Sequence, residues 1–420
     1  MVIQLKDTEI IKSLFDKEYL ENKKVNNSIQ NNPHEKKNIT TQTSTFDKIV
    51  EPLIQDKRDV VFVKLSLKLL LLVSSSIYMI FYKFSWIHFF IHAVFQAKFT
   101  VSYILMLHCC CHKNLYKPKY WYLELIIPYV LGPFLGQTLD SFYFHHVKHH
   151  HVEDNGPGDL SSTLKYQRDN WFHFVCYFSR FLFLSWIELP LYFAKKGWYL
   201  TGLRVMMGEF ITLGFFVACT KYANTNGALC LLWFPFALVR FGMMSGNWGQ
   251  HAFIEPTRMD DDYVQSITCI NSEYNNVAFN DGYHTSHHLN PIRHWADHPG
   301  NLVEQKQKYH DKGTIIFNNL DFHLVWVALM LKDYKTLSKS YVNLNSAGLE
   351  IEKSEEDLIK IENLLRRRTK RFTQQEIIKY YGKPTSKPIY EVEKDSKPKS
   401  DQGSKKESGQ YKPKHEKSTD

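Results

Sequence analysis

Five histidines stand within seven residues in His145-His146-Val147-Lys148-His149-His150-His151, at the end of an apolar segment. The acidic and amide residues of Val152-Glu153-Asp154-Asn155 follow directly. Neutral imidazole is the commonest protein ligand for transition metals, and clustering it is costly unless a cation binds there. The run therefore predicts a metal site, and the rest of the chain indicates what else contributes to it.

Three further groups of candidate ligands flank this run. His108 and His112 are four residues apart, as are Asn247 and His251, and each pair would share one face of a helix. The third group has the spacing i, i+3, i+4, which places three imidazoles on one helical face: His284, His287 and His288. Each pair alone is equally compatible with ordinary packing or helix capping, whereas three histidines on one face are more specific.

Apolar segments long enough to cross about 30 Å of hydrocarbon predict transmembrane helices. Four such spans are predicted, over residues 60–82, 86–107, 203–222 and 227–245. Residues 121–144 are apolar but interrupted by proline and glycine, which favours a segment that lies in the interface or dips in and returns. Residues 171–193 carry Arg180, Glu188 and Pro190, which favours an interfacial helix. Shorter helices are predicted at 314–331 and 358–368.

Four spans place every histidine group and both ends of the chain on one side, and flanking Lys and Arg favour the cytosol. Residues 1–58 are polar and predicted to be mostly disordered, residues 59–331 form the membrane domain, and residues 332–420 form a basic extension, helical and then disordered. The net charge of +9 comes largely from this extension, which indicates a cytoplasmic face rather than a nucleic-acid partner. Seven cysteines without a disulfide framework indicate a reducing compartment.

The order of the groups resembles the membrane-bound fatty acid desaturase and hydroxylase family, over residues 60–331. The resemblance implies an all-α integral membrane protein of about four spans, with a cytosolic helical cap in which histidines bind two irons. It implies that Asn247 holds a metal-bound water. The implied metal site comprises His108, His112, His146, His150, His151, Asn247, His251, His284, His287 and His288, with His145 or His149 as possible substitutes.

The register of the central run stays open. His146, His150 and His151 follow the family's longer spacing, whereas His146, His149 and His150 give the better single helical face. Glu153, Asp154 and Asp159 are candidates to orient the imidazoles, although ordinary loop acids would look the same. Cys109, Cys110 and Cys111 are interpreted as packing residues, with metal binding or palmitoylation as alternatives.

The predicted function is O2-dependent desaturation of a long lipid alkyl chain in the endoplasmic reticulum membrane. Two irons would activate O2 to an oxidant that removes hydrogen from an unactivated CH2 group, and no catalytic residue beyond the metal site is predicted. The alternatives are hydroxylation on the same scaffold, a histidine-rich membrane metal-binding or transport protein, and an inactive homologue that serves as a scaffold.

Other cofactor chemistries lack their motifs. The chain has neither the Glu-x-x-His of soluble di-iron bundles nor the His-Glu-x-x-His of zinc proteases. His298-Pro299-Gly300-Asn301 is similar to the haem-binding His-Pro-Gly-Gly of cytochrome b5 but departs from it at Asn301. A Gly-rich dinucleotide fingerprint is also absent, so electrons are expected from a separate cytochrome b5-like or ferredoxin-like donor.

Overall fold

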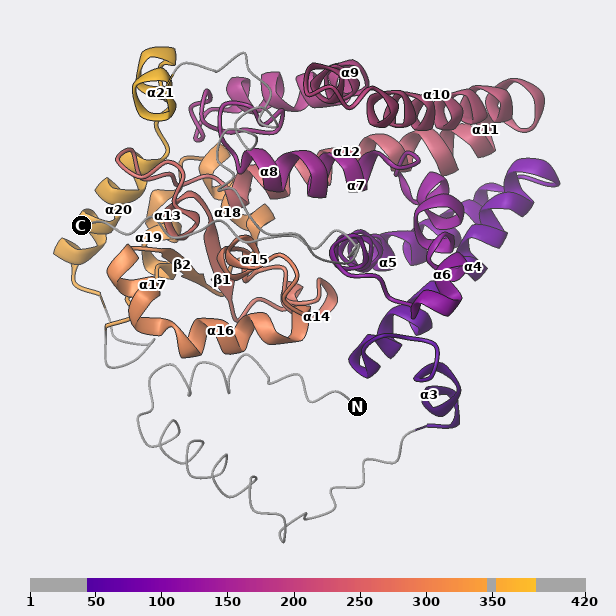
Figure 1. Ribbon diagram of the computed structural model, residues 1–420, viewed down its shortest axis with the longest axis horizontal. Coiled ribbons are helices and arrows are strands. Elements are labelled where there is room, and N and C mark those ends of the chain that lie inside the picture. The colour runs from indigo at the N-terminus through magenta and orange to yellow at the C-terminus, as the bar shows by residue number, and fades with distance from the viewer. Residues whose placement is uncertain (1–43, 346–352, 383–420) are drawn as a thin grey trace, which may run out of the picture.

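The computed structural model describes residues 44–345 and 353–382, and this part of the chain is mostly helical, with two short strands (Figure 1). Two long helices, α4 (Val60–Phe81) and α5 (Trp86–His112), form the predicted hairpin. The second extends one turn further than predicted, so that both His108 and His112 belong to its last turns. The prediction for residues 1–43 and 383–420, that they are disordered, lies outside the described residues.

Three more long helices follow. They are α9 (Trp171–Lys195), α10 (Tyr199–Tyr222) and a continuous rod made of α11 (Thr225–Ala228), a π-helical turn (Leu229–Trp233) and α12 (Phe234–Gln250). Five helices of the described chain are thus long and apolar enough to cross a membrane. Four of them match the predicted spans. The fifth, α9, was predicted to be interfacial, but its length and mean hydropathy equally suit a span, and it packs along α10.

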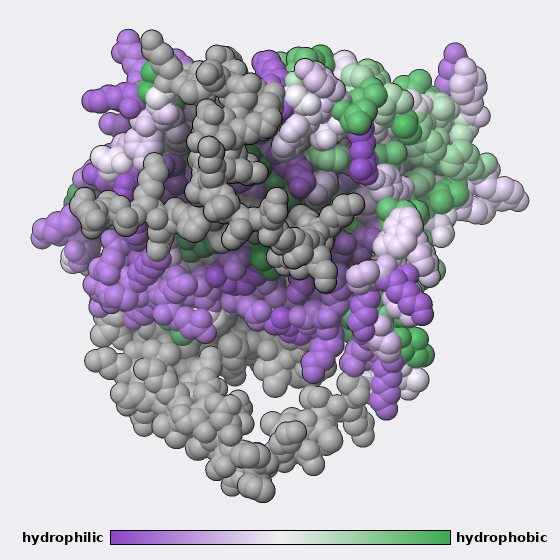
Figure 2. Space-filling model, in the orientation of Figure 1, coloured by the Kyte–Doolittle hydropathy of each residue, from purple (hydrophilic) through white to green (hydrophobic). Residues whose placement is uncertain are grey.

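Apolar side chains gather on the surface of the long helices, at the upper right of Figure 2, whereas polar residues cover the opposite part of the molecule. Leu200 on α10, for example, is 84% exposed. Such a surface is stable against lipid rather than water. The prediction of an integral membrane protein with a polar helical cap is confirmed.

The interrupted segment between α5 and α9 consists of short pieces rather than one span. It contains α6 (Trp121–Glu124), a π-helical turn (Ile126–Leu131), a 3-10 turn (Gly132–Leu135), α7 (Ser141–His145), a second π-helical turn (His146–His150) and α8 (His151–Glu153). Gly136 has φ +83° and lies so close to α12 that a Cβ would stand 2.6 Å from the Pro235 carbonyl oxygen. Only glycine fits this turn, which brings the segment against α12.

The cap is built from short helices around two parallel strands, β1 (Ile267–Ile270) and β2 (Ile315–Asn318), with Ile267 opposite Ile315. Its helices lie at the left of Figure 1. They are α13 (Asp262–Gln265), α14 (Tyr274–Val277), α15 (His284–Leu289), α16 (His298–Glu304), α17 (Lys306–Lys312), α18 (Phe322–Met330), α19 (Tyr334–Ser340), α20 (Glu355–Arg368) and α21 (Gln374–Tyr381).

The prediction of one amphipathic helix over 314–331 is wrong. The segment begins as β2 and becomes α18 only after Asn319, whose φ of +58° ends the strand. Ile315, Ile316 and Phe317 are fully buried, and two of the three are β-branched, which favours a strand once a partner such as β1 is present. The predicted helix at 358–368 is confirmed as the main part of α20.

Part of the segment predicted as disordered is folded. It forms α3 (Thr45–Val50) and a 3-10 turn at Lys57–Asp59. The carboxylate of Asp59 accepts hydrogen bonds from His294 Nε2 and Trp295 Nε1, both at 2.9 Å. These bonds join the start of α4 to the cap.

A buried arginine joins the C-terminal segment to the loop that follows the central histidine run. Arg168 is fully buried and donates hydrogen bonds to the main-chain oxygens of Thr163, Tyr166, Ala252, Arg368 and Lys370, at 2.5–3.1 Å. Three segments distant in sequence therefore share one cation. Removing it would leave buried carbonyl groups without partners, which is costly.

We expect Arg168→Met to lower the free energy of unfolding of the detergent-solubilised protein by about 3 kcal/mol or more, because several buried carbonyls lose their donor. The exposed Arg371 provides the matched control, and Arg371→Met should leave stability within about 0.5 kcal/mol. Denaturant titration measures both. Equal stability of the two variants would contradict the proposed role of Arg168.

Candidate metal centre

The first candidate ligands stand where the long helices end. His108 and His112 lie one turn apart on the last turns of α5, and His251 follows directly after α12. The residues of α15 supply His284, His287 and His288 from the cap. All four groups predicted from the sequence therefore meet at one end of the helical bundle.

The central run contributes through an unusual local geometry. Residues 146–150 form a π-helical turn, in which positions i and i+5, rather than i and i+4, come to lie on one face. His146 and His151 accordingly approach each other, with their Nε2 atoms 3.1 Å apart. His150 is turned to a different side, so that one short run supplies imidazoles to two groups.

Five histidines form a first group, whose ligand nitrogens all lie within 4.8 Å of one another: His108, His112, His146, His151 and His287. The Nε2 atom of His287 is central, at 3.0 Å from that of His108 and 2.9 Å from that of His151. The members come from α5, the π-helical turn, α8 and α15. We call this set the first histidine group.

A second histidine group lies beside it. His150, His251 and His288 have ligand nitrogens within 4.8 Å of one another. The Nε2 atom of His284 joins them, at 3.3 Å from that of His251 and 3.0 Å from that of His288. The two groups are adjacent, since the ring centroids of His151 and His288 are 5.0 Å apart.

The protonation of the second group can be derived from its partners. His251 Nδ1 lies 3.0 Å from the main-chain oxygen of Gln265, which can only accept, so Nδ1 carries the proton. In the neutral ring, Nε2 of His251 therefore carries a lone pair, and it lies 3.3 Å from Nε2 of His284. His150 and His288 donate from Nδ1 to carboxylates in the same way.

Burial favours the neutral form of these rings, which is the form that binds metals. It lowers the pKa of His146, His151 and His287 well below the usual value. Buried lone pairs that converge without a donor are unfavourable unless a cation sits among them. The donor sets therefore fit two cations, one in each group, and all-imidazole sites suit iron, zinc, copper or nickel.

Carboxylates orient several of the imidazoles. His150 Nδ1 donates to Asp159 at 2.6 Å, and His288 Nδ1 donates to Asp154 at 3.1 Å. Burial raises the pKa of the Asp159 carboxyl, but His150 outweighs it, and the net shift is downward. Asp154 and Asp159 thus lie where the sequence analysis expected orienting acids. Glu153 does not, because its carboxylate accepts from Tyr192 Oη and Lys196 Nζ, at 2.6 and 2.8 Å.

Sequence reasoning missed Asp281. Its Oδ1 atom lies 3.7 Å from His108 Nδ1, and its Oδ2 accepts from Gln250 Nε2 at 3.2 Å. Burial raises the pKa of this carboxyl to about 7. The available signal was its position three residues before His284, on the opposite side of the histidines from the acids that were considered.

The remaining predicted residues lie at the edge of the two groups. His145 and His149 gather with Asp159 in a separate set rather than with the first or second histidine group. The side-chain amide of Asn247 donates to the Ser161 main-chain oxygen at 3.1 Å and to Tyr177 Oη at 2.6 Å. Asn247 also borders, with His150 and His284, the cavity described next.

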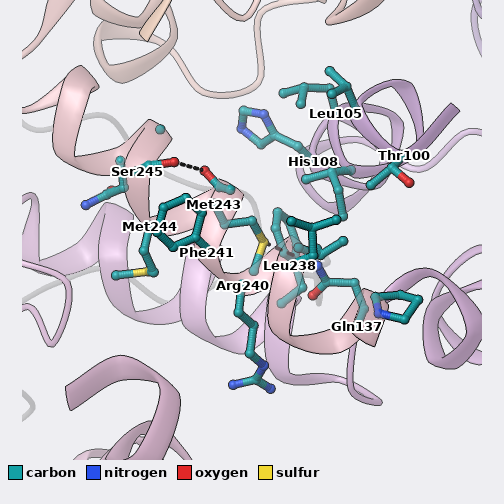
Figure 3. A pocket seen from close by; sticks show the side chains of 18 of the residues that line it. Thr100, Leu105, His108, Gln137, Leu238, Arg240, Phe241, Met243, Met244 and Ser245 are labelled. Carbon is teal, nitrogen blue, oxygen red and sulfur yellow. Dashed lines mark hydrogen bonds between the residues drawn. The ribbon is translucent and has the colours of Figure 1, made fainter. Parts of the chain in front are cut away.

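A cavity of about 700 Å³ reaches the histidine groups from between the long helices. Its wall includes Thr100 and Leu105 on α5 and Leu238, Met243 and Met244 on α12, and His108 stands at its border (Figure 3). The volume falls in the range of sites that enclose a small molecule, and most of the wall is apolar. A flexible apolar chain would fit between the bundle and the histidines.

These features define a class of protein, an integral membrane protein whose apolar cavity leads to two groups of histidines that could hold metal ions. A model of the family "Fatty acid desaturase" matches residues 69–314, which is more than half of the chain. The chain belongs to the fatty acid desaturase family. Comparison with the curated proteins and with the solved structures finds no match.

The register of the central run can be tested directly. We expect His151→Ala to lower the metal bound by the purified protein, because Nε2 of His151 lies within the first histidine group. His149→Ala should leave the metal content unchanged, since its ring lies in the separate set with Asp159. Inductively coupled plasma mass spectrometry measures the metal. The reverse pattern would assign the ligand to His149.

The orienting acids provide a second test. Asp159→Asn should weaken metal binding by about 10- to 100-fold, because the amide no longer offers an anionic acceptor to His150 Nδ1. Glu153→Gln removes a charge from the same loop but not from an imidazole, and should have little effect. Metal competition with a chelator measures both affinities. A similar loss of metal affinity in both variants would show that the negative charge of the loop, and not the hydrogen bond to His150, supports metal binding.

Proposed function

We propose that this protein is an O2-dependent di-iron enzyme that introduces a double bond into a long alkyl chain of a membrane lipid. One observation carries the proposal: an apolar cavity between membrane helices ends at two adjacent groups of buried imidazoles. The family implies lipid oxidation by a metal-dependent oxidoreductase. Two irons, when bound, would supply the oxidant that removes hydrogen from an unactivated CH2 group.

The residues of the chain have distinct roles in this proposal. His108, His112, His146, His151 and His287 hold one iron, and His150, His251, His284 and His288 hold the other. Asn247, whose amide nitrogen is engaged by Ser161 and Tyr177, completes the second set through its carbonyl oxygen, directly or through a water. Asp154 and Asp159 hold the protons on the Nδ1 atoms of His288 and His150, which fixes the tautomer that presents Nε2 to the metal.

The apolar cavity wall contributes positioning and the exclusion of water. A chain held along α5 and α12 would pass His108, His146 and His284, all of which border the cavity. Holding the reacting carbon at one point of the chain is what selects the bond to be oxidised. A mostly apolar enclosure also protects a reactive site from competing reactions with water.

The proposal extends to the cellular setting of the protein. The histidine groups lie at one end of the long helices, and we propose that this end and both termini face the cytosol at the endoplasmic reticulum. Electrons would come from a cytochrome b5-like or ferredoxin-like donor. A metal transporter, the alternative class, is less well supported because its ligands would be expected near mid-membrane within the spans rather than at their ends.

Expression in a host that lacks the relevant lipid activity tests the proposal. We expect a new, O2-dependent double bond in the lipids of cells that carry the chain, detected by mass spectrometry, and about two irons per purified chain. His287→Ala should abolish the product, because Nε2 of His287 lies at the centre of the first histidine group. His310→Ala, a half-buried histidine of the cap outside both groups, is the matched control and should retain it.

Each contrary result has a defined meaning. A new hydroxyl group in place of the double bond would assign hydroxylation on the same scaffold. Zinc alone in the purified protein, with no iron and no lipid product, would contradict the proposed function. An unchanged product from His287→Ala would contradict the site.

A further inference from the structure

A charged pair lies inside the helical bundle, outside the two histidine groups. The guanidinium of Arg240 on α12 approaches the carboxylate of Glu209 on α10, with its terminal nitrogen 3.1 and 3.3 Å from the two oxygens. Both side chains are buried and belong to helices long and apolar enough to span the membrane. Ionisable residues at such positions are costly and usually functional.

Three hydroxyl groups complete the surroundings of this pair. Thr138 and Ser141 donate to Glu209 Oε1 at 2.7 and 2.6 Å. Arg240 donates to Thr138 Oγ1 at 3.1 Å and to Ser185 Oγ at 3.4 Å, and its guanidinium carbon lies 4.2 Å from the ring centroid of Phe236. We call Thr138, Ser141, Ser185, Glu209 and Arg240 the Arg240 cluster.

The Arg240 cluster borders the cavity that reaches the histidine groups, and all five of its residues belong to the wall. Arg240 precedes Asn247 by seven residues, or about 10 Å along the helix axis. The cavity continues past it to Phe234 and Cys230, so the cluster does not close its end. In Figure 3 the guanidinium extends to the side of α12 opposite His108.

A plain alkyl chain does not explain this wall. It would cover charged and hydroxyl groups without offering them a hydrogen bond, at a cost in desolvation. Stability alone is a weak explanation for the ion pair, since apolar residues of similar volume often replace buried pairs without loss of stability. A polar wall inside an apolar cavity is instead typical of a site that fixes the orientation of its ligand.

The hydrogen-bonding capacity of the Arg240 cluster indicates the kind of ligand. Within the described part of the chain, Glu209 Oε2 contacts Arg240 at 3.3 Å and takes no other hydrogen bond, whereas Oε1 takes three. Arginine has five N–H donors, of which the terminal nitrogens serve the contacts above. A hydroxyl group both donates and accepts, and so complements a carboxylate oxygen beside a guanidinium. The pair is neutral overall, which disfavours a charged ligand.

We propose that the Arg240 cluster binds a hydroxyl group carried on the alkyl chain of the lipid substrate, and that it sets the position of that chain relative to the histidine groups. This inference rests on the proposed function, because it takes the cavity as the site of the alkyl chain. It adds a substrate class, hydroxylated rather than plain alkyl chains.

Binding to the purified, detergent-solubilised chain tests the inference without turnover. Octadecanoic acid and its positional hydroxy isomers would compete with a fluorescent fatty acid for the cavity. We expect at least one isomer to bind about tenfold or more tightly than octadecanoic acid, as for a hydrogen bond to a charged group. In the double variant Glu209→Leu/Arg240→Met the preference should fall to about twofold or less. Met207→Leu, on the exposed face of α10 and outside the cavity wall, should retain it.

The outcomes separate the inference from the proposed function. Equal binding of octadecanoic acid and every hydroxy isomer by the unmodified chain would overturn the inference, whether or not the double variant folds. A preference that persists in the double variant would also overturn it and leave the pair as a contact between α10 and α12. If no fatty acid displaced the probe, the cavity would not be a site for an alkyl chain. This result would contradict both the proposed function and the inference.

Discussion

The structure depends on one electrostatic constraint, the convergence of nine imidazoles in a buried space. Five form the first histidine group and four the second, and several of their Nε2 atoms stand about 3 Å apart. Three of these rings, His150, His251 and His288, commit their Nδ1 protons to acceptors, and in the neutral form they direct Nε2 lone pairs into this space. Lone pairs that converge in a buried space are unfavourable. Either a bound cation or stabilising contacts in the surrounding fold must offset that cost in free energy.

Hydrogen bonds hold the imidazoles and the segments that carry them in place. Asp154 and Asp159 hold two imidazoles by their Nδ1 protons, and the Gln265 carbonyl holds a third. The loop that carries Asp159 is in turn attached through Thr163 Oγ1 to the His251 main-chain oxygen, at 2.8 Å. Arg168 then joins this loop to residues 368–370, which lie outside the matched family region. These imidazoles are thus held by hydrogen bonds that extend into the C-terminal segment.

The long helices, in contrast, enclose a cavity with few polar contacts, and the exception is the Arg240 cluster. This cavity is mostly apolar and could accommodate a flexible alkyl chain. The Arg240 cluster places charged and hydroxyl groups in the cavity wall. A cavity that only needed to admit hydrocarbon would not need this pair. On the proposed function, the contrast between a tightly held set of imidazoles and a largely apolar cavity with one polar site would allow a single bond of a long chain to be presented to the metals.

The sequence by itself determined four of the five long apolar helices, the order of the histidine groups and the local faces, because periods of three to four residues and apolar runs of about 20 residues are local properties. His284, His287 and His288 share a helical face as their spacing predicts. Only the tertiary structure decided which imidazoles share a group. The π-helical turn separates His150 from His146 and His151, and neither it nor the strand β2, paired with β1, is evident from local spacing. Asp281 beside His108, and Glu209 beside Arg240, are contacts between segments far apart in sequence, and packing alone determines which of them meet.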